Sequence, residues 1–218
     1  MLSGPVAVID FETTGLSPAA GHRATEIAIV LLERGQVVGR FQSLMNAGRH
    51  LPPFIEEYTG ISNAMVRAAP PAAEVMTEAL RFVQGAPLVA HNAVFDQGFW
   101  ESELRRMSER KRPDPVHSHP APFACTMLVS RRLYPQAISY RLGALADLHA
   151  LPSAGRAHRA LADAEVAAAL LCRIRSDLQQ RFQVEDAPHE LLVKLQQSQR
   201  RSLPKAIAAY FEGLRSDA

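Results

Sequence analysis

Two acidic residues separated by one position stand near the N-terminus of the chain. Asp10 and Glu12 follow the β-prone run VAVI at 6–9, at and just beyond the end of an expected strand. Side chains two positions apart in an extended chain point to the same side, so both carboxylates would face one point. Neighbouring carboxylates repel unless a cation lies between them, and such hard oxygen ligands suit Mg²⁺ or Mn²⁺. An isolated Asp-x-Glu is more often the start of a solvated loop, so the pair alone decides nothing.

A third acid follows a different expected strand. Asp96 comes shortly after the apolar run PLVA at 87–90, which predicts a buried strand. If this strand lies close to the first strand, Asp96 would be a third ligand for the same cation. An acid near a helix start can also simply complement the helix dipole, and taken alone this is the better interpretation.

A histidine and a fourth acid lie five positions apart in the segment AHRALADA at 157–164. On one continuous helix, His158 and Asp163 would be separated by about 140°. They can converge only if His158 lies on a loop before the helix, and the residues SAG at 153–155 predict such a loop. Histidine ordinarily titrates near pH 6.5, which suits a general base. The alternative is a surface histidine ahead of an acid that complements the dipole.

The elements that must position these residues alternate between strands and helices. Strands are expected at 6–9, 26–32, 37–45 and 87–90, and helices at 72–83, 94–107, 126–133, 142–148 and 161–178, with short helical pieces within 52–69. The proline-rich residues 111–122 predict an exposed loop. This order predicts an α/β fold with a mixed central β-sheet flanked by α-helices.

The sequence changes character after Val184, where Gln- and Arg-rich helical stretches are split by Pro204. We therefore expect a main domain at 1–183 and a helical C-terminal extension at 184–218. The extension carries an apolar stripe worth burying, made of Leu191, Leu192, Leu195, Leu203, Ile207 and Phe211. It could dock on a partner, fold back on the domain or mediate self-association.

Composition argues against a disordered, membrane-spanning or secreted protein but does not identify the function. Hydrophobic residues make up 47% and charged residues 21%, as in an ordinary globular protein and unlike a disordered one. No run is long enough to cross a bilayer, and the N-terminus does not resemble a secretory signal. The two cysteines, Cys125 and Cys172, lack metal-ligand spacing and indicate a reducing compartment. A cytoplasmic protein without a membrane partner is expected, and the net charge of +2 permits a polyanionic partner without demanding one.

Three motifs taken together are far more specific than each alone. The strings VIDFETTGL at 8–16, HNAVFD at 91–96 and HRALAD at 158–163 occur in the order that defines a known family. Over roughly residues 5–178 the chain resembles the DnaQ-like (DEDDh) 3'→5' exonucleases, typified by the proofreading epsilon subunit of bacterial DNA polymerase III. The histidine at 158, where another branch has tyrosine, is what marks the DEDDh branch.

The resemblance implies a ribonuclease H-like fold and two divalent cations, Mg²⁺ or Mn²⁺. Carried over motif by motif, the metal ligands are Asp10, Glu12, Asp96 and Asp163. His158 is then the base that takes a proton from the attacking water.

The resemblance also implies contacts with the terminal nucleotide. They involve the backbone around Thr13, Thr14 and Gly15, the apolar side chain of Leu16, the loop residue Thr59, and an apolar residue at the position of Phe95. Phe95 could equally belong to the core, since it lies between a strand and an apolar helix face.

The expected function is hydrolysis of nucleic-acid 3' ends with release of nucleoside 5'-monophosphates. Single-stranded or frayed DNA ends are the preferred substrate, and RNA is the second substrate class. Two further alternatives stay open: a non-catalytic module that uses the same fold for binding, and a polymerase-associated subunit as opposed to a free-standing enzyme. The C-terminal extension is the expected contact with a DNA polymerase or with a second copy.

Overall fold

A computed structural model describes residues 4–107, 122–152, 158–199 and 202–216. A five-stranded sheet in the order β3-β2-β1-β4-β5 forms its centre. The strands are β1 (Val6–Thr13), β2 (Ala24–Glu33), β3 (Gln36–Leu44), β4 (Leu88–Ala90) and β5 (Ala124–Cys125). The strands β1, β2 and β3 are antiparallel, whereas β4 runs parallel to β1 and β5 parallel to β4, so the expected mixed sheet is confirmed.

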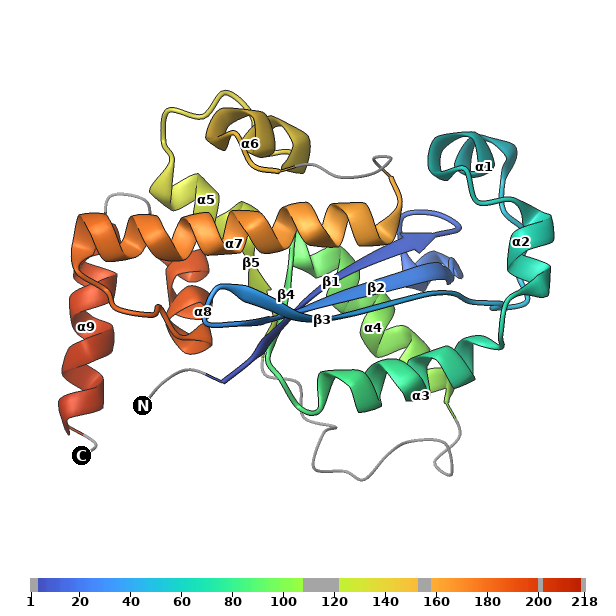
Figure 1. The fold of residues 1–218 in the computed structure, drawn as a ribbon, viewed down its shortest axis with the longest axis horizontal. Coiled ribbons are helices and arrows are strands. Elements are labelled where there is room, and N and C mark those ends of the chain that lie inside the picture. Colours follow the sequence, from blue (N-terminus) through green and yellow to red (C-terminus); the bar gives the residue numbers. More distant parts are fainter. Residues whose placement is uncertain (1–3, 108–121, 153–157, 200–201, 217–218) are drawn as a thin grey trace.

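Helices lie on both faces of this sheet (Figure 1). The helices of the described residues are α1 (Pro53–Thr59), α2 (Asn63–Ala68), α3 (Ala72–Val83), α4 (Ala93–Arg106), α5 (Thr126–Leu133), α6 (Leu142–His149), α7 (Ala160–Phe182), α8 (His189–Gln197) and α9 (Leu203–Ser216). The long helix α7 crosses one face, and α3 and α4 lie against the other. No helix in the described part of the chain is long and apolar enough to span a bilayer.

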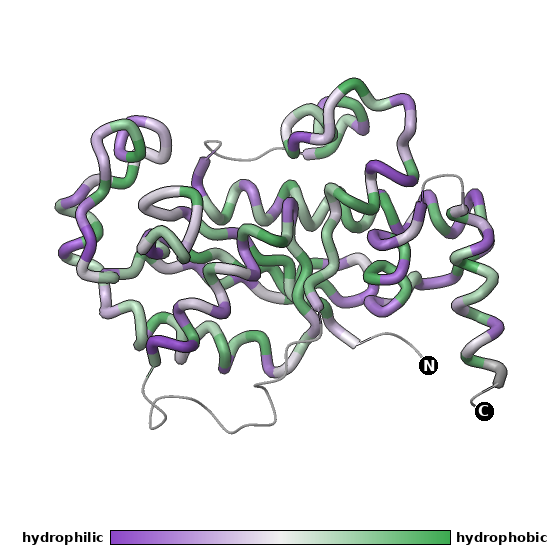
Figure 2. The backbone as a smooth tube through the Cα atoms, turned by 180° about the vertical axis from the view of Figure 1, so that it is seen from behind, coloured by the Kyte–Doolittle hydropathy of each residue, from purple (hydrophilic) through white to green (hydrophobic). Residues whose placement is uncertain are grey.

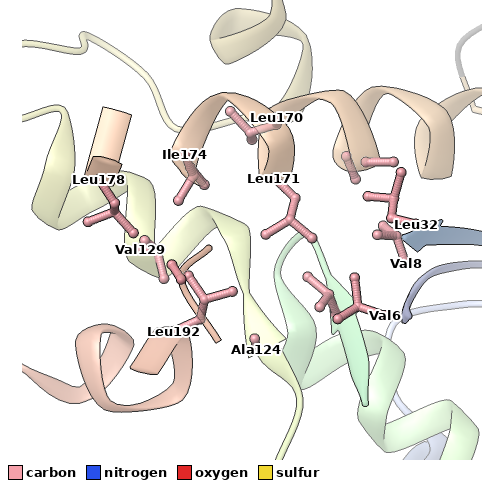
Figure 3. Packing of buried hydrophobic residues seen from close by; sticks show 14 of the residues in the cluster. Val6, Val8, Leu32, Ala124, Val129, Leu170, Leu171, Ile174, Leu178 and Leu192 are labelled. Atoms are coloured by element: carbon pink, nitrogen blue, oxygen red, sulfur yellow. The ribbon is translucent and has the colours of Figure 1, made fainter. Parts of the chain in front are cut away.

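Two apolar cores lie on the two faces of the sheet. Alternate residues of the central strand β1 enter each one: Val8 joins the core under α7, and Ile9 joins the core under α3 and α4. Burial on both faces explains the nearly continuous apolar runs of β1 and β2. Figure 3 shows side chains of α7, including Leu171 and Ile174, packed among residues of the sheet and of α5 and α8. Figure 2 shows the same concentration of hydrophobic residues at the centre of the fold.

The first strand is longer than the sequence predicts. We expected it to end near Ile9, but β1 continues to Thr13 because β2 pairs with it over its whole length, from Val6 opposite Leu32 to Thr13 opposite Ala24. Tertiary pairing here overrides the low strand preference of acidic residues. Asp10 and Glu12 therefore lie inside a strand, not at the start of a loop.

The C-terminal helices fold back onto the domain. Leu191, Leu192 and Leu195 of α8 are at most 1% exposed and belong to the core under α7. Leu203 and Ile207 of α9 are also buried in that core, and Phe211 packs partly buried against it. The apolar stripe of the extension is thus covered within the chain. The division at residue 183 stays a prediction, and the two parts share one core.

The edge strand β5 was not expected from the sequence, because two residues give no readable strand pattern. It is completed by a side chain from the C-terminal extension: Gln196 Oε1 accepts a hydrogen bond from the Cys125 amide at 2.6 Å, and Gln196 Nε2 donates to the Phe123 carbonyl at 3.0 Å. Covering an edge in this way satisfies backbone groups that would otherwise be open to another chain.

Two expectations fall largely outside the described residues. The expected loop at 111–122 is described only at Pro122, and the expected turn at 153–155 is not described at all.

We predict that the C-terminal extension contributes to stability through α8. Leu195→Ala should lower the free energy of unfolding by about 2–5 kcal/mol, because it opens a cavity in a core that cannot collapse fully. Leu214→Ala is the matched control, since Leu214 is 52% exposed in the same extension and its replacement should cost little. Urea denaturation of both variants measures the difference. Equal losses would contradict the packing role of α8.

Candidate active site

Three carboxylates from two elements meet at one end of the sheet. Asp10 and Glu12 project from the same side of β1, and Asp163 lies in the first turn of α7. One carboxylate oxygen from each lies within 4.8 Å of the other two, and all three side chains are half-buried. The helix brings Asp163 here because α7 packs along β1 and β2.

Asp96 lies beside this cluster but is not among the three mutually close carboxylates. It is 2% exposed in the first turn of α4, and its Oδ1 accepts a hydrogen bond from the Phe11 amide at 3.1 Å. Phe11 stands between Asp10 and Glu12 in β1. The structure therefore brings together three of the four expected ligands and places the fourth next to the backbone that carries two of them.

Burial and mutual repulsion disfavour the charged forms of these acids. Burial, followed by the charges of Asp96, Glu12, Asp163 and Glu26, raises the pKa of Asp10 well above its ordinary value. Burial and then Asp163 and Glu26 raise the pKa of Glu12 to about 8, although Arg159 opposes them.

The other two acids follow the same rule. Burial raises the pKa of Asp96 despite the hydrogen bond from Phe11, and burial raises that of Asp163 despite a hydrogen bond from His158. An all-oxygen cluster of this kind lacks positive charge, and divalent cations would supply it. The residues fit the expected cofactors.

His158 lies on the segment before α7, as the spacing to Asp163 requires. Its backbone has φ 63°, in the left-handed region, and its amide donates to Asp163 Oδ2 at 3.1 Å. The imidazole stacks on the ring of Tyr58 in α1, with centroids 3.9 Å apart and an interplanar angle of 28°. The imidazole of His158 is thus held at the border of the acid cluster.

Three residues of this region were missed by the sequence analysis. Tyr58 lies close enough to the cluster that, after burial, the charges of Glu12 and Asp163 raise its pKa. Glu26 and Arg159 form a salt bridge of 2.7 Å beside the cluster. Two signals were available: Glu26 begins the otherwise apolar run EIAIVLL, and Arg159 directly follows His158 in the third motif.

The turn after β1 is held rigidly. Thr13 Oγ1 donates to the Gly15 carbonyl at 2.7 Å, and Thr14 Oγ1 accepts from the Arg23 amide at 3.0 Å. Thr13 and Thr14 are 6% and 5% exposed, so these hydrogen bonds hold two buried residues in place.

Close packing also explains the glycine of the turn. A Cβ on Gly15 would lie 2.5 Å from the ring of His22, so a larger residue would push that ring away. The next residue, Leu16, is 86% exposed and projects from the rigid turn.

An open groove adjoins the turn and the start of α4. Leu16, Val94 and Phe95 are among the residues that line it, and its volume is about 560 Å³. Phe95 also contacts Phe99, with ring centroids 4.9 Å apart, so it faces both the core and the groove.

Thr59 lies inside the fold. It is 1% exposed, its hydroxyl donates to the Ile55 carbonyl at 2.8 Å and accepts from the Ile61 amide at 3.1 Å. Its side chain therefore shapes the end of α1. Contact with the terminal nucleotide stays a prediction for Thr59, as for the turn residues and Phe95.

Comparisons with known proteins agree with this geometry. The family model RNase_T, described as exonuclease, matches residues 7–171. The 3'-5' exonuclease DinG of Bacillus subtilis (strain 168) is 38% identical over 173 residues, covering 79% of this chain and 18% of DinG. A PolC-type DNA polymerase III of Halalkalibacterium halodurans is 33% identical over 181 residues, covering 83% of this chain and 12% of the polymerase.

A solved structure supports the same conclusion. Exonuclease X in complex with 5' overhanging duplex DNA superimposes with a TM-score of 0.65 and 28% identity, covering 88% of this chain and 99% of that one. The chain belongs to the RNase_T exonuclease family, and the DnaQ-like, ribonuclease H-like assignment expected from the three motifs is confirmed. It spans less than a fifth of the length of DinG and of the PolC-type polymerase.

We predict that the acid cluster makes stability depend on pH and on divalent cations. In EDTA, the raised pKa of Glu12 means that the folded state keeps a proton that the unfolded state releases above about pH 4.5. Stability should therefore fall as the pH rises from about 5 to 8, and Mg²⁺ should reverse the fall by neutralising the carboxylates. Thermal melting across this range measures it. Glu12→Gln should flatten the EDTA profile, and an unchanged slope in that variant would contradict the assignment.

Proposed function

We propose that this chain is a 3'→5' exonuclease that hydrolyses phosphodiester bonds at DNA 3' ends and releases nucleoside 5'-monophosphates. The observation that carries the proposal is the meeting of Asp10, Glu12 and Asp163 within 4.8 Å, with Asp96 alongside and His158 at the border. The presence of all five residues favours catalysis over a module that only binds nucleic acid.

The four acids are proposed to hold two divalent cations, Mg²⁺ or Mn²⁺. Asp10, Glu12 and Asp163 offer the shared set of oxygens, and Asp96 adds a further carboxylate beside Asp10. When bound, such cations neutralise the scissile phosphate and lower the pKa of water. The carboxylates are half-buried, and electrostatic interactions are stronger there than in bulk water.

His158 is proposed to act as the general base. In the reaction, the oxygen of water forms a bond to phosphorus and the water proton passes to the imidazole. The bond from phosphorus to the 3'-oxygen of the preceding nucleotide breaks, and that oxygen takes a proton from solvent to become a 3'-hydroxyl. The attachment of the His158 amide to Asp163 keeps the base within the reach of the acid cluster.

The preferred substrate is proposed to be a single-stranded or frayed 3' end of DNA, with RNA as the second substrate class. Two similarities favour DNA: the match to a PolC-type DNA polymerase III, and the match to exonuclease X in complex with 5' overhanging duplex DNA. The exposed Leu16 and the groove beside it offer an apolar surface to a terminal base. Contact with the face of a base does not depend on its identity, so this surface would accept any sequence.

Association with a DNA polymerase or self-association through the C-terminal extension stays a prediction, as does the cytoplasmic location. The apolar stripe of the extension is occupied within the chain, so a partner would have to use the outer faces of α8 and α9.

The proposal is tested with 3'-labelled oligonucleotides of single-stranded DNA, mismatched duplex DNA and RNA, each with Mg²⁺, with Mn²⁺ and with EDTA. The wild-type protein should release mononucleotides from DNA fastest, and EDTA should stop the release. Asp10→Asn and Asp163→Asn should lose at least about 100-fold in rate, because even a group that only orients a metal ligand is worth about 10- to 100-fold. Asp147→Asn, which replaces an exposed aspartate of α6, is the control. Wild-type rates in the cluster variants would refute the scheme.

We predict that His158→Ala lowers kcat by about 10²- to 10⁴-fold at neutral pH, the usual contribution of a general base. The deficit should shrink as the pH rises, because hydroxide then replaces the water that needs a base. Rates from pH 6 to 10 measure it, with Mn²⁺ titrated separately to verify that the variant still binds cations. A deficit that is constant across this range would exclude His158 as the base.

A further inference from the structure

Beside the acid cluster lies a buried carboxylate that is not placed to hold a cation. Glu26 of β2 is 1% exposed and stands directly opposite Glu12 in the antiparallel register. It is not one of the three mutually close carboxylates. A buried carboxylate next to other acids persists only where hydrogen bonds and an opposite charge compensate for its desolvation.

Four hydrogen bonds provide that compensation. Arg159 donates from Nη2 to Oε1 at 2.7 Å and from Nε to Oε2 at 3.1 Å, which is a two-point contact between guanidinium and carboxylate. Gln42 Nε2 donates to Oε1 at 2.8 Å, and the Ala160 amide donates to Oε2 at 3.1 Å. Three of these four bonds come from Arg159, which directly precedes α7, and from Ala160, its first residue.

The contact between Arg159 and Glu26 bears on the site because Arg159 is next to His158 in the chain. Arg159 directly follows His158, and Ala160 is the first residue of α7. The segment 158–160 is therefore attached at three points: the His158 amide to Asp163, the Arg159 side chain to Glu26, and the Ala160 amide to Glu26. His158 holds a left-handed backbone conformation, which a non-glycine residue keeps only when its surroundings fix it.

We infer that the Glu26–Arg159 pair is a positioning device for His158, holding the backbone of the base against the sheet so that its imidazole stays at the acid cluster. The inference rests on the proposed function for its kinetic effect and on the structure alone for its geometric effect. Arg159 acts here through its neighbour, as a positioning residue.

The competing role for an arginine at this place is direct contact with a substrate phosphate. Two of its three nitrogens, Nε and Nη2, are engaged by Glu26, and the side chain is 32% exposed. A phosphate contact would appear in KM and would be independent of His158, whereas a positioning role would appear in kcat and would require His158. The two roles are therefore separable by experiment.

The kinetic test is a double-mutant cycle. Arg159→Ala should lower kcat by about 10- to 100-fold, as a small misplacement of a reacting group does, with KM changed less than about threefold. In a His158→Ala background the same substitution should change kcat by less than about threefold, because its effect passes through the missing imidazole. Equal losses in both backgrounds, or a loss confined to KM, would overturn the inference.

Two further variants refine the cycle. Arg159→Lys keeps the charge but not the two-point contact, so it should lose most of what Arg159→Ala loses. Arg40→Ala is the matched control: Arg40 bonds Glu165 at 2.6 Å and likewise joins the sheet to α7, but through a more exposed pair whose side chains are 52% and 27% exposed. It should leave kcat unchanged. A kcat of Arg159→Lys equal to that of the wild type, or an Arg40→Ala loss as large as that of Arg159→Ala, would overturn the inference.

A spectroscopic test does not depend on activity. The imidazole of His158 stacks on Tyr58, so its ring C–H resonance, identified by its loss in His158→Ala, should be shifted upfield in the wild type. Arg159→Ala should move this resonance to the position of a free histidine, and Arg40→Ala should leave it in place. An unmoved resonance in Arg159→Ala would overturn the inference, whether or not the chain cleaves nucleic acid. If the resonance moves as expected but the wild type cleaves no substrate, the proposed function fails and the positioning role stands.

Discussion

The structure must hold several carboxylates close together at one end of a sheet, although their charged forms repel one another. Asp10 and Glu12 share a face of β1, Asp163 arrives from α7, and Asp96 and Glu26 stand alongside. Burial raises the pKa of Asp10 and Glu12, so without added positive charge their charged forms are disfavoured. The apolar cores above and below the sheet hold the backbone rigid enough that the carboxylates cannot separate. Packing in the two cores therefore offsets the repulsion among the carboxylates, which are left in a position suited to divalent cations.

The parts of this site that depend on local patterns were predictable from the sequence. An acid pair two positions apart on a strand must share a side, and the angle between positions 158 and 163 on a helix requires His158 to precede it. The structure has both features, with Asp163 in the first turn of α7. Strands β1 to β4 followed from short apolar runs and helices α3 to α7 from helical patterns, and the order of three motifs indicated the family. Each of the structural inferences depends on residues close together in the chain, and the family assignment depends on the order of three short motifs.

The parts that were not predicted arise from contacts between distant segments. Glu26 and Arg159 are separated by 133 positions, and nothing in either neighbourhood shows that the two will meet. The same applies to Tyr58, whose ring reaches His158 from a different helix. The end of β1 was placed too early because pairing with β2, and not the preference of individual residues, decides where the strand stops. The folded-back extension was one of three alternatives, and only packing could select it.

The side chain of Gln196 covers the edge of β5, and this has a consequence for folding during translation. Its partner Cys125 precedes it by 71 positions, so translation at about 5–20 residues per second leaves that edge uncovered for roughly 4–14 s. During this interval the nascent sheet offers free amide and carbonyl groups to whatever lies nearby. The edge of β5 is covered only after α8 has been synthesised. Until then, the growing chain is open to pairing with other strands at this edge.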